Sequence, residues 1–413
     1  MHSVAPFFVH IADHMRKEQL FFVHVLKNRA ALRRQWVFCV PRTVACLFTV
    51  SEHCVLSNKI NSMAVIREIQ DNGASGLAFS THLQELWIDG ASNSVIFLIA
   101  LGGITIFSAE YVPDGNGEIR LYNLRRILES HIDGVFADFV FTVKESGKSE
   151  HSVSYRVFKT AVRVSECAEE FLPSFFLTTL INRKLTQLGR YETLSFYPQS
   201  ACSVYALASY YTESGIDTKE VSLMSEQDVV LNVVNSVNVS PSRFVDDSMG
   251  ELIGYVVRAG ERSFSFEIDS TQAKADPALL FLNNFGCWET MYLTGTIETE
   301  YEIKRSHAYI DGRFRQYDID DTEYFKANSG VLLDSMLRLG MDLARSKSIF
   351  LLDSMGVADD EIVLSDSEIK YANDDDSMPS FDYTYRRASF VPGMLHTIRP
   401  PKLFDKTFDV TFN

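Results

Sequence analysis

Two stretches of the chain alternate apolar and polar side chains with a period of two. Residues 263–268 read Ser-Phe-Ser-Phe-Glu-Ile, and residues 297–303 read Ile-Glu-Thr-Glu-Tyr-Glu-Ile. This alternation is typical of a strand with one face against a core and the other in water, and it does not place the apolar residues on one face of a helix. The sequence therefore predicts a mainly β fold.

The first 62 residues differ in composition from the rest of the chain. They contain no Gly and no Tyr, although the whole chain has 21 and 17. They carry eight Lys/Arg and three Asp/Glu, which leaves 31 basic and 51 acidic residues, a net charge of −20, from Met63 onward. We expect a poorly structured extension, with the folded protein beginning at Met63. A signal peptide is the alternative, but Pro41 and Arg42 interrupt its apolar stretch.

The acidic balance and the short apolar runs exclude two classes of partner. A protein that binds nucleic acid by neutralising phosphates concentrates Lys/Arg on one surface, so no nucleic acid is expected. The apolar run from Val95 to Phe107 is shorter than the roughly 20 residues that a membrane span needs, so no membrane is expected. Gly102-Gly103 in its middle predicts a hairpin turn between two buried strands.

Turn signals divide residues 63–413 into an N-terminal domain, a connector and a larger domain. In residues 63–165 we expect a β-sandwich of the immunoglobulin-like or fibronectin-like kind, with Asn123 capping a short helix. The predicted strands there are residues 86–88, 94–101, 104–112, 135–144 and 153–164. Residues 166–189 form a connector whose pattern fits helix or strand. The predicted fold class is thus tandem β-sandwich domains with a few short helices.

Residues 190–413 are expected to form one or more larger β domains with one helix near 331–347. Further strands are predicted at residues 291–310, 348–352, 361–364 and 380–385. The helix is predicted because five apolar residues fall on one helical face. These residues are Leu333, Met336, Leu337, Met341 and Ala344.

No catalytic or metal-binding motif stands out from Met63 onward, so no cofactor and no enzymatic activity are expected. The cysteines Cys167, Cys202 and Cys287 are odd in number and far apart, which fits neither a disulfide framework nor a zinc site. Glu298, Glu300 and Glu302 lie on one face of a strand, whereas a glycosidase needs two opposed carboxyl groups. The acidic clusters at 318–323 and 373–376 leave a calcium site open as an alternative, although neither has EF-hand spacing.

Abundant aromatic residues suggest a different kind of site. Tyr210 and Trp288 can act as stacking platforms for sugar rings, although aromatic residues in alternating strands also pack in cores. Phe404, Phe408 and Phe412 recur every four residues near the C-terminus, and they can either dock on a partner or belong to an edge strand. These five residues are the candidate ligand or partner contacts.

Three stretches together resemble virion proteins of tailed phages and prophages of Bacteroidetes. They are the Tyr-Val-Pro-Asp-Gly-Asn-Gly-Glu-Ile run at 111–119, the Leu-Asn-Asn-Phe-Gly-Cys-Trp-Glu-Thr run at 282–290, and the tail at 403–413. The resemblance spans Met63 to Asn413. It implies a tail-associated β-sandwich protein that is assembled in the bacterial cytoplasm, resides in the virion, and contacts other virion proteins or further copies of itself.

The sequence as a whole favours a non-enzymatic structural or assembly protein that acts through protein–protein contacts. A glycan-binding or adhesion module that uses exposed aromatic residues is the alternative. A glycoside hydrolase is the third and least favoured hypothesis. A chain that begins at Met63 is expected to fold and assemble as the full chain does.

Overall fold

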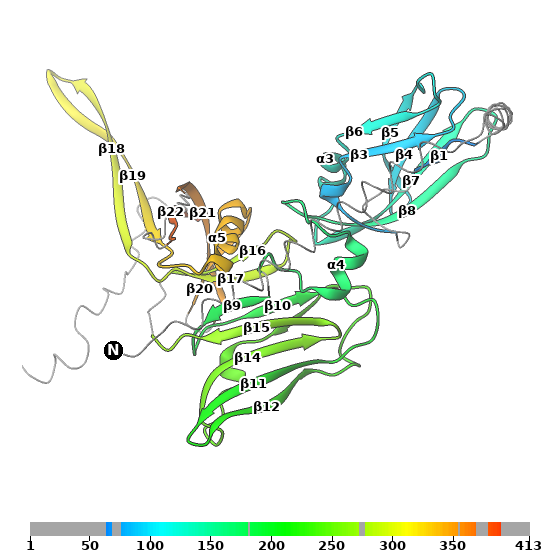
Figure 1. Cartoon of the computed structure of the whole chain (residues 1–413). Coiled ribbons are helices and arrows are strands. Elements are labelled where there is room, and N and C mark those ends of the chain that lie inside the picture. The colour runs from blue at the N-terminus through cyan, green and yellow to red at the C-terminus, as the bar shows by residue number, and fades with distance from the viewer. Residues whose placement is uncertain are drawn as a thin grey trace, which may run out of the picture.

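The computed structural model describes residues 63–67, 76–180, 182–271, 277–353, 356–368 and 379–389. Over these ranges the fold is mainly β, with several sheets and three short α-helices, which confirms the predicted mainly β class. Figure 1 shows three β units, with one long hairpin leaving the last of them. The N-terminal extension and the aromatic tail residues Phe404, Phe408 and Phe412 lie outside the described residues.

The N-terminal unit contains two sheets that share one core. Its elements are β1 (Val65–Ile66), β2 (Leu77–Phe79), β3 (Glu85–Asp89), β4 (Val95–Leu101), β5 (Ile104–Tyr111), β6 (Ile119–Tyr122), α3 (Leu124–Glu129), β7 (Phe136–Glu145) and β8 (His151–Phe158). The sheet orders are β2-β8-β7-β4-β5 and β1-β3-β6. Phe97 and Phe141 from the first sheet and Leu86 from the second belong to the same buried cluster.

Most predicted strands of this unit are confirmed, and two details are wrong. The Gly102-Gly103 turn joins β4 to an antiparallel β5, as predicted. However, β5 is not a buried strand, because it lies at the edge of its sheet and Ile104 is exposed. Asn123 precedes α3 but makes no side-chain cap, because its backbone is in the left-handed region at φ 62°. That conformation, which Asn tolerates better than most residues, turns the chain out of β6.

The middle unit is a five-stranded sheet with a two-stranded ribbon beside it. Its elements are α4 (Ala168–Ser174), β9 (Arg183–Thr186), β10 (Thr193–Phe196), β11 (Val204–Thr212), β12 (Gly215–Met224), β13 (Asn235–Asn238), β14 (Glu251–Ala259) and β15 (Arg262–Ile268). The sheet order is β12-β11-β14-β15-β9. Residues 166–189, predicted to be helix or strand, therefore contain one of each. The alternation predicted for residues 263–268 is confirmed in β15, which follows a hairpin turn at Gly260.

The C-terminal unit is a seven-stranded sheet with one helix against it. Its elements are β16 (Ala278–Leu282), β17 (Trp288–Tyr292), β18 (Ile297–Ile310), β19 (Arg313–Asn328), α5 (Leu337–Arg345), β20 (Ile349–Leu352), β21 (Ala358–Glu368) and β22 (Asp382–Arg387). The sheet order is β17-β16-β20-β21-β22-β19-β18. Its core is continuous with that of the middle unit, since Phe264 and Phe281 belong to one buried cluster.

The seven-stranded sheet is strongly curled. β17 and β18 are its two edge strands, yet only residues 293–296 join them. Such a link reaches at most about 18 Å, whereas the edges of a flat seven-stranded sheet lie about 29 Å apart. The amides of Thr294 and Gly295 donate to the carbonyls of Ser329 and Asn328, each at 3.1 Å. The predicted single strand at 291–310 is therefore wrong, because the chain crosses between edges there.

The helix prediction is also corrected. α5 covers Leu337–Arg345 and follows a 3-10 turn at Asp334–Met336. The predicted apolar face was based on a single α-helix that begins at Leu333. A 3-10 turn has fewer residues per turn than an α-helix, so the residues of α5 lie on other faces than predicted. Leu339 and Leu343 are consequently the fully buried residues of the helix, while Met341 is exposed.

A third buried cluster joins all three units. Phe79 and Phe158 come from the N-terminal unit, Phe171 from α4, and Phe285 from the loop between β16 and β17. The Phe171 and Phe285 rings stack with centroids 5.2 Å apart. The junction is therefore a packed aromatic core, which fixes the units relative to one another.

Candidate functional site

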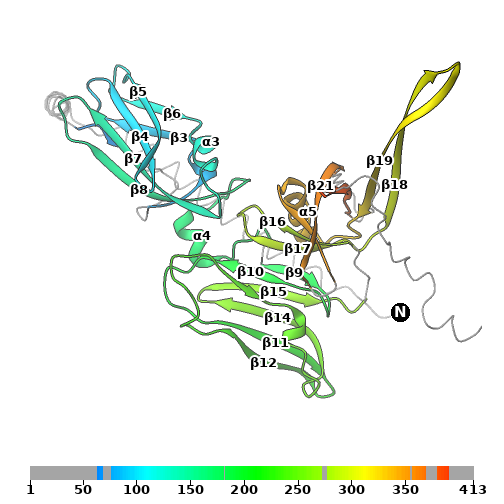
Figure 2. The same ribbon diagram turned by 180° about the vertical axis from the view of Figure 1, so that it is seen from behind.

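The most unusual surface of the protein is the hairpin formed by β18 and β19. We call residues 297–326 the arm. Figures 1 and 2 show it projecting away from the rest of the molecule, and both strands are exposed along most of their length. Asp311 and Gly312 at its tip both have positive φ, which is the requirement of a type I′ hairpin turn. The arm is thus a regular two-stranded ribbon whose two faces are both open.

The two faces of the arm differ in chemistry. Residues paired across the ribbon lie on the same face. The register therefore assigns each side chain of β18, together with its partner on β19, to one of the two faces. One face, the apolar face, carries Ile297, Tyr301, Ile303, Tyr309, Phe314, Ile319 and Phe325. The opposite, charged face carries Glu298, Glu300, Glu302, Lys304, Arg313, Arg315, Asp318, Asp320 and Lys326.

The apolar face continues the core side of the seven-stranded sheet. Ala327 is buried, and Phe325 stacks on Tyr385 of β22 with ring centroids 5.2 Å apart. Further out the same face is uncovered: Tyr309 is 66% exposed and Phe314 is 79% exposed. Their rings meet edge to face at 5.1 Å. A soluble protein rarely leaves such a run of large apolar side chains open unless another molecule covers it.

Charge is unevenly distributed along the arm. The outer half, residues 304–317, has four basic residues and one acidic residue. The inner half, residues 297–303 and 318–326, has seven acidic residues and one basic residue. Within the inner half the Tyr301 hydroxyl donates to Glu323 at 2.8 Å, and this hydrogen bond raises the pKa of Tyr301. The arm therefore has a positive tip and a negative base.

Of the five predicted contact residues, Tyr210 and Trp288 belong to the described part of the chain, and they lie on different sheets. Tyr210 is only 1% exposed, and its hydroxyl donates to the Phe244 carbonyl at 2.6 Å. It is a core residue, because β11 points it inward and leaves its neighbour Tyr211 exposed, and it is not available to a ligand. Trp288 on edge strand β17 is 41% exposed and packs edge to face on Phe350.

The sequence predicted residues 297–310 of the arm as a strand, but neither the second strand β19 nor the exposure of the hairpin. The prediction placed residues 298, 300 and 302 on one solvated face, which is where they lie, and did not single out the apolar face opposite. The usable signal is the run at 313–319, where Phe314, Tyr317 and Ile319 follow directly on the Asp-Gly turn. In the part of the chain that the structure describes, no other strand is as long as β18 or β19, and none pairs with their outer part.

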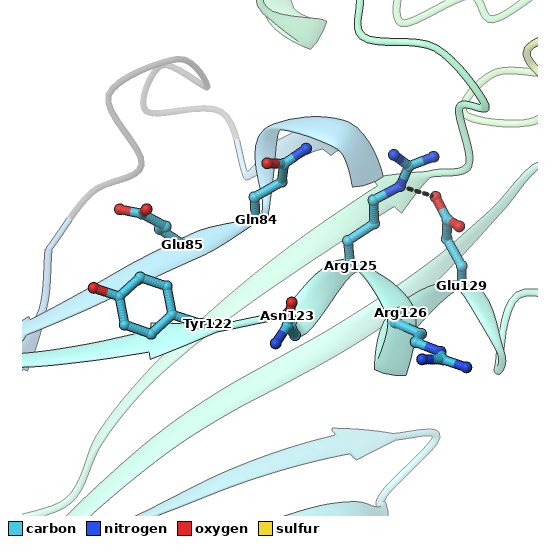
Figure 3. A pocket seen from close by; sticks show the side chains of 7 residues that line it. All are labelled: Gln84, Glu85, Tyr122, Asn123, Arg125, Arg126 and Glu129. Atoms are coloured by element: carbon cyan, nitrogen blue, oxygen red, sulfur yellow. Dashed lines mark hydrogen bonds and ion pairs between the residues drawn. The ribbon is translucent and has the colours of Figure 1, made fainter.

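A polar hollow of about 480 Å³ lies on the N-terminal unit beside α3 (Figure 3). Arg125 and Glu129 in its wall form an ion pair at 2.7 Å. The same guanidinium donates to the carbonyls of Thr160 and Ala161, so it is held by the protein itself. The other five lining residues are all exposed, namely Gln84, Glu85, Tyr122, Asn123 and Arg126. This arrangement holds the turn after β8 against α3.

Polar groups are also concentrated in the interior, between the middle and C-terminal units. Lys184 on β9 pairs with Glu192 at 2.7 Å and donates to the Thr290 carbonyl of β17 at 2.6 Å. Next to it Glu289 accepts from Thr178 at 2.9 Å. Burial raises the pKa of Glu289, against the opposing effects of the Lys184 charge and its hydrogen bonds. These groups are enclosed and link strands of the two units.

Among the described residues no cluster of three or more His, Cys, Asp and Glu has a geometry that would hold a metal ion. The acidic run at 318–323 lies on the arm, and the run at 373–376 is outside the described residues. Within the described ranges, no helix combines the length and the apolar character needed to cross a membrane. The described cysteines Cys167, Cys202 and Cys287 are all free thiols.

No protein-family model matches the chain, and no curated protein shows significant similarity to it. The function is therefore inferred from the chain's own residues.

Proposed function

We propose that this protein is a non-enzymatic structural or assembly protein that acts through protein–protein contacts, with the arm as its contacting element. The observation that carries the proposal is the uncovered apolar face of the arm, from Ile297 to Phe314. Removing apolar surface from water is favourable by about 25 cal/mol per Å², and this gain opposes the entropic cost of association. A ribbon that leaves the body with one face apolar is suited to lie on another protein.

The setting we propose is a tail-associated component of a phage or prophage virion. The motif resemblances at 111–119 and 282–290 support it. The first motif connects β5 to β6, which belong to different sheets, and the second contains the turn between the paired strands β16 and β17. Assembly would take place in the bacterial cytoplasm, with other virion proteins or further copies of the chain as partners. We also propose that the N-terminal unit is a β-sandwich, since its two sheets contribute to one core.

The test of this function is the composition of purified particles. Phages or induced prophages from the source bacterium are purified by density gradient, and their proteins are identified by mass spectrometry. The chain is expected in the particle at a constant ratio to other tail proteins. Its absence from particles, or a gene neighbourhood without portal, tape-measure or baseplate genes, would contradict the virion assignment.

Glycan binding is the second candidate, and the half-exposed Trp288 favours it. An exposed indole on an edge strand offers a flat face to a sugar ring. Binding to a glycan array that is lost in Trp288→Ala and kept in Tyr211→Ala would replace the first proposal. A glycoside hydrolase is the weakest candidate, since Glu298, Glu300 and Glu302 share one face of a single strand and do not oppose each other across a cleft.

A further inference from the structure

We propose that the arm binds the arm of a second copy of this chain, with the two ribbons antiparallel and their apolar faces against each other. The inference rests on the proposed function, because it names the partner of that contacting surface. It follows from two independent properties of the arm, its apolar face and its charge polarity.

The apolar face runs the whole length of the arm, so its partner must be long and apolar as well. Ile297 lies at the base, Ile303 in the middle and Phe314 at the tip, all on the same face by register. Fourteen residues of β18 span about 46 Å at the rise of an extended strand. Among the described residues the sheet supports only the base of the arm, since β22 pairs with β19 at Phe325–Asn328, and the outer side chains are exposed.

The charge polarity selects the direction of the partner. A second arm lying parallel would place positive tip on positive tip and negative base on negative base. In the antiparallel arrangement the positive outer half of each arm overlies the negative inner half of the other, and Arg305 is the basic residue of each outer half that lies on the contacting face. Complementary charge of this kind fixes orientation and suppresses the wrong arrangement.

The charged residues on the apolar face also favour the antiparallel arrangement. Arg305 shares that face with Asp321 and Glu323, and Arg305 belongs to the outer half while both carboxylates belong to the inner half. Reversing a second arm brings Arg305 of each copy toward the carboxylates of the other. A two-fold axis across the middle of the arm therefore brings apolar side chains together and also places opposite charges near each other. The same surface is used by both copies, as in an isologous contact.

The size of the contact sets its strength. A two-stranded ribbon about 46 Å long and about 10 Å wide buries roughly 900 Å² in total when two of them meet face to face. Specific stable interfaces usually bury about 1,200–2,000 Å², so arm pairing alone gives a reversible dimer. Such a dimer suits a component whose contacts form during assembly.

The test is a charge exchange between two variants of the full chain, followed by sedimentation velocity. Arg305→Glu makes one variant, and the double change Asp321→Arg with Glu323→Arg makes the other. Each variant alone is expected to dimerise at least about tenfold more weakly than the wild type, and an equimolar mixture is expected to recover dimers. Recovery in the mixture is not expected from misfolding or from general loss of charge.

A second pair of variants tests the apolar face. Phe314→Ser is expected to weaken dimerisation about tenfold, whereas Tyr211→Ser, a similarly exposed aromatic residue on β11, is expected to leave it unchanged. Both variants should keep the wild-type melting temperature because both side chains are largely exposed. A wild-type chain that stays monomeric at several hundred micromolar, or dimers that persist in Phe314→Ser, would overturn the proposal.

Other occupants of the apolar face give different results. If a chain shortened to residue 389 dimerises where the full chain does not, the C-terminal tail covers the arm in the full chain, and the pairing proposed for the full chain is wrong. If the full chain is monomeric but copurifies with virions in an arm-dependent way, the arm binds another virion protein. That outcome would overturn this inference and leave the proposed function standing.

Discussion

Lys184 and Glu192 form an ion pair of 2.7 Å in which the two side chains are only 4% and 1% exposed. Three further groups complete the pair: Thr186 and Thr290 donate to Glu192, and the Thr290 carbonyl accepts from Lys184. Because Thr290 belongs to β17 and the ion pair to the middle unit, this cluster fastens the C-terminal sheet to the middle sheet.

Replacing Lys184 by Met is expected to destabilise the protein by about 3–5 kcal/mol, because the change leaves the Glu192 carboxylate buried without its cation. The measurement is chemical denaturation at neutral pH, followed by tryptophan fluorescence. Lys304→Met is the matched control, since Lys304 pairs with Glu302 on the exposed arm, and it should not shift the midpoint. Equal midpoints for the two variants would contradict the role given to the buried pair.

The buried carboxyl of Glu289 makes stability depend on pH. Burial raises its pKa above the 4.5 of a free glutamate. A carboxyl with a raised folded pKa stabilises folding fully below the unfolded value and loses that contribution as the pH rises to the folded value. Glu289→Gln should therefore gain stability relative to the wild type between pH 4 and pH 8, as melting temperatures at several pH values would reveal.

Two other carboxyl groups, those of Asp342 and Asp246, provide a comparison in the same pH series. Burial also raises the pKa of Asp342, which accepts from Thr179 at 2.9 Å, so Asp342→Asn should show a change of the same sign. Asp246 is the opposite case, since the hydrogen bond from Lys219 lowers its pKa to about 2. Asp246→Asn should accordingly lose stability relative to the wild type above pH 4. A common sign for Asp246 and Glu289 would show that burial does not control Glu289.

Gly340 in α5 is a site where helix propensity and packing oppose each other. Alanine is favoured over glycine by about 1 kcal/mol in a helix. A Cβ at Gly340, however, would lie 2.2 Å from the Phe381 ring, and overpacking costs about 1–3 kcal/mol. We expect Gly340→Ala to lower the melting temperature. Gly134→Ala, where a Cβ meets no atom within 4 Å, is the comparison, and a more stable Gly340→Ala would mean that α5 can shift away from β22.

Arg156 holds the N-terminal unit to the middle unit. Its guanidinium pairs with Asp138 on β7 and donates to the Tyr197 hydroxyl and to the Asn232 carbonyl, both at 2.8 Å. Arg156→Ala should speed tryptic cleavage in residues 159–167 roughly several-fold, because local opening of the junction becomes easier. Arg120→Ala, which removes a contact to Trp87 inside the N-terminal unit, should leave that cleavage rate unchanged.

Local patterns predicted those strands that are joined by tight turns. An apolar run with a Gly-Gly turn in its middle identifies β4 with β5, and alternation identifies β15, because each signal lies within a few consecutive residues. β2 and β9 were not predicted, because each is short and pairs in parallel with a strand about 80 residues away. A strand of three or four residues carries too few positions to show a period.

The arm was harder to predict for a different physical reason. Alternation with a period of two indicates that the two faces of a strand differ in polarity. It does not indicate whether other residues cover the apolar face. Tyr210 and Tyr211 make the same point within one dipeptide, since the pattern requires one to face inward and does not say which. Exposure is decided by the sheet order, which brings β22 against only the base of β19.

That sheet order has a consequence for biosynthesis. The arm strands leave the ribosome about 55 residues before β22, the strand that pairs with the base of β19 and connects both to the rest of the sheet. Until Asp382–Arg387 has been made, the arm is a lone hairpin, which is marginally stable in water. The growing chain therefore carries its apolar ribbon unanchored for several seconds at ordinary translation rates of about 5–20 residues per second. Premature stops between residues 328 and 382 should consequently yield aggregating fragments instead of a smaller soluble protein.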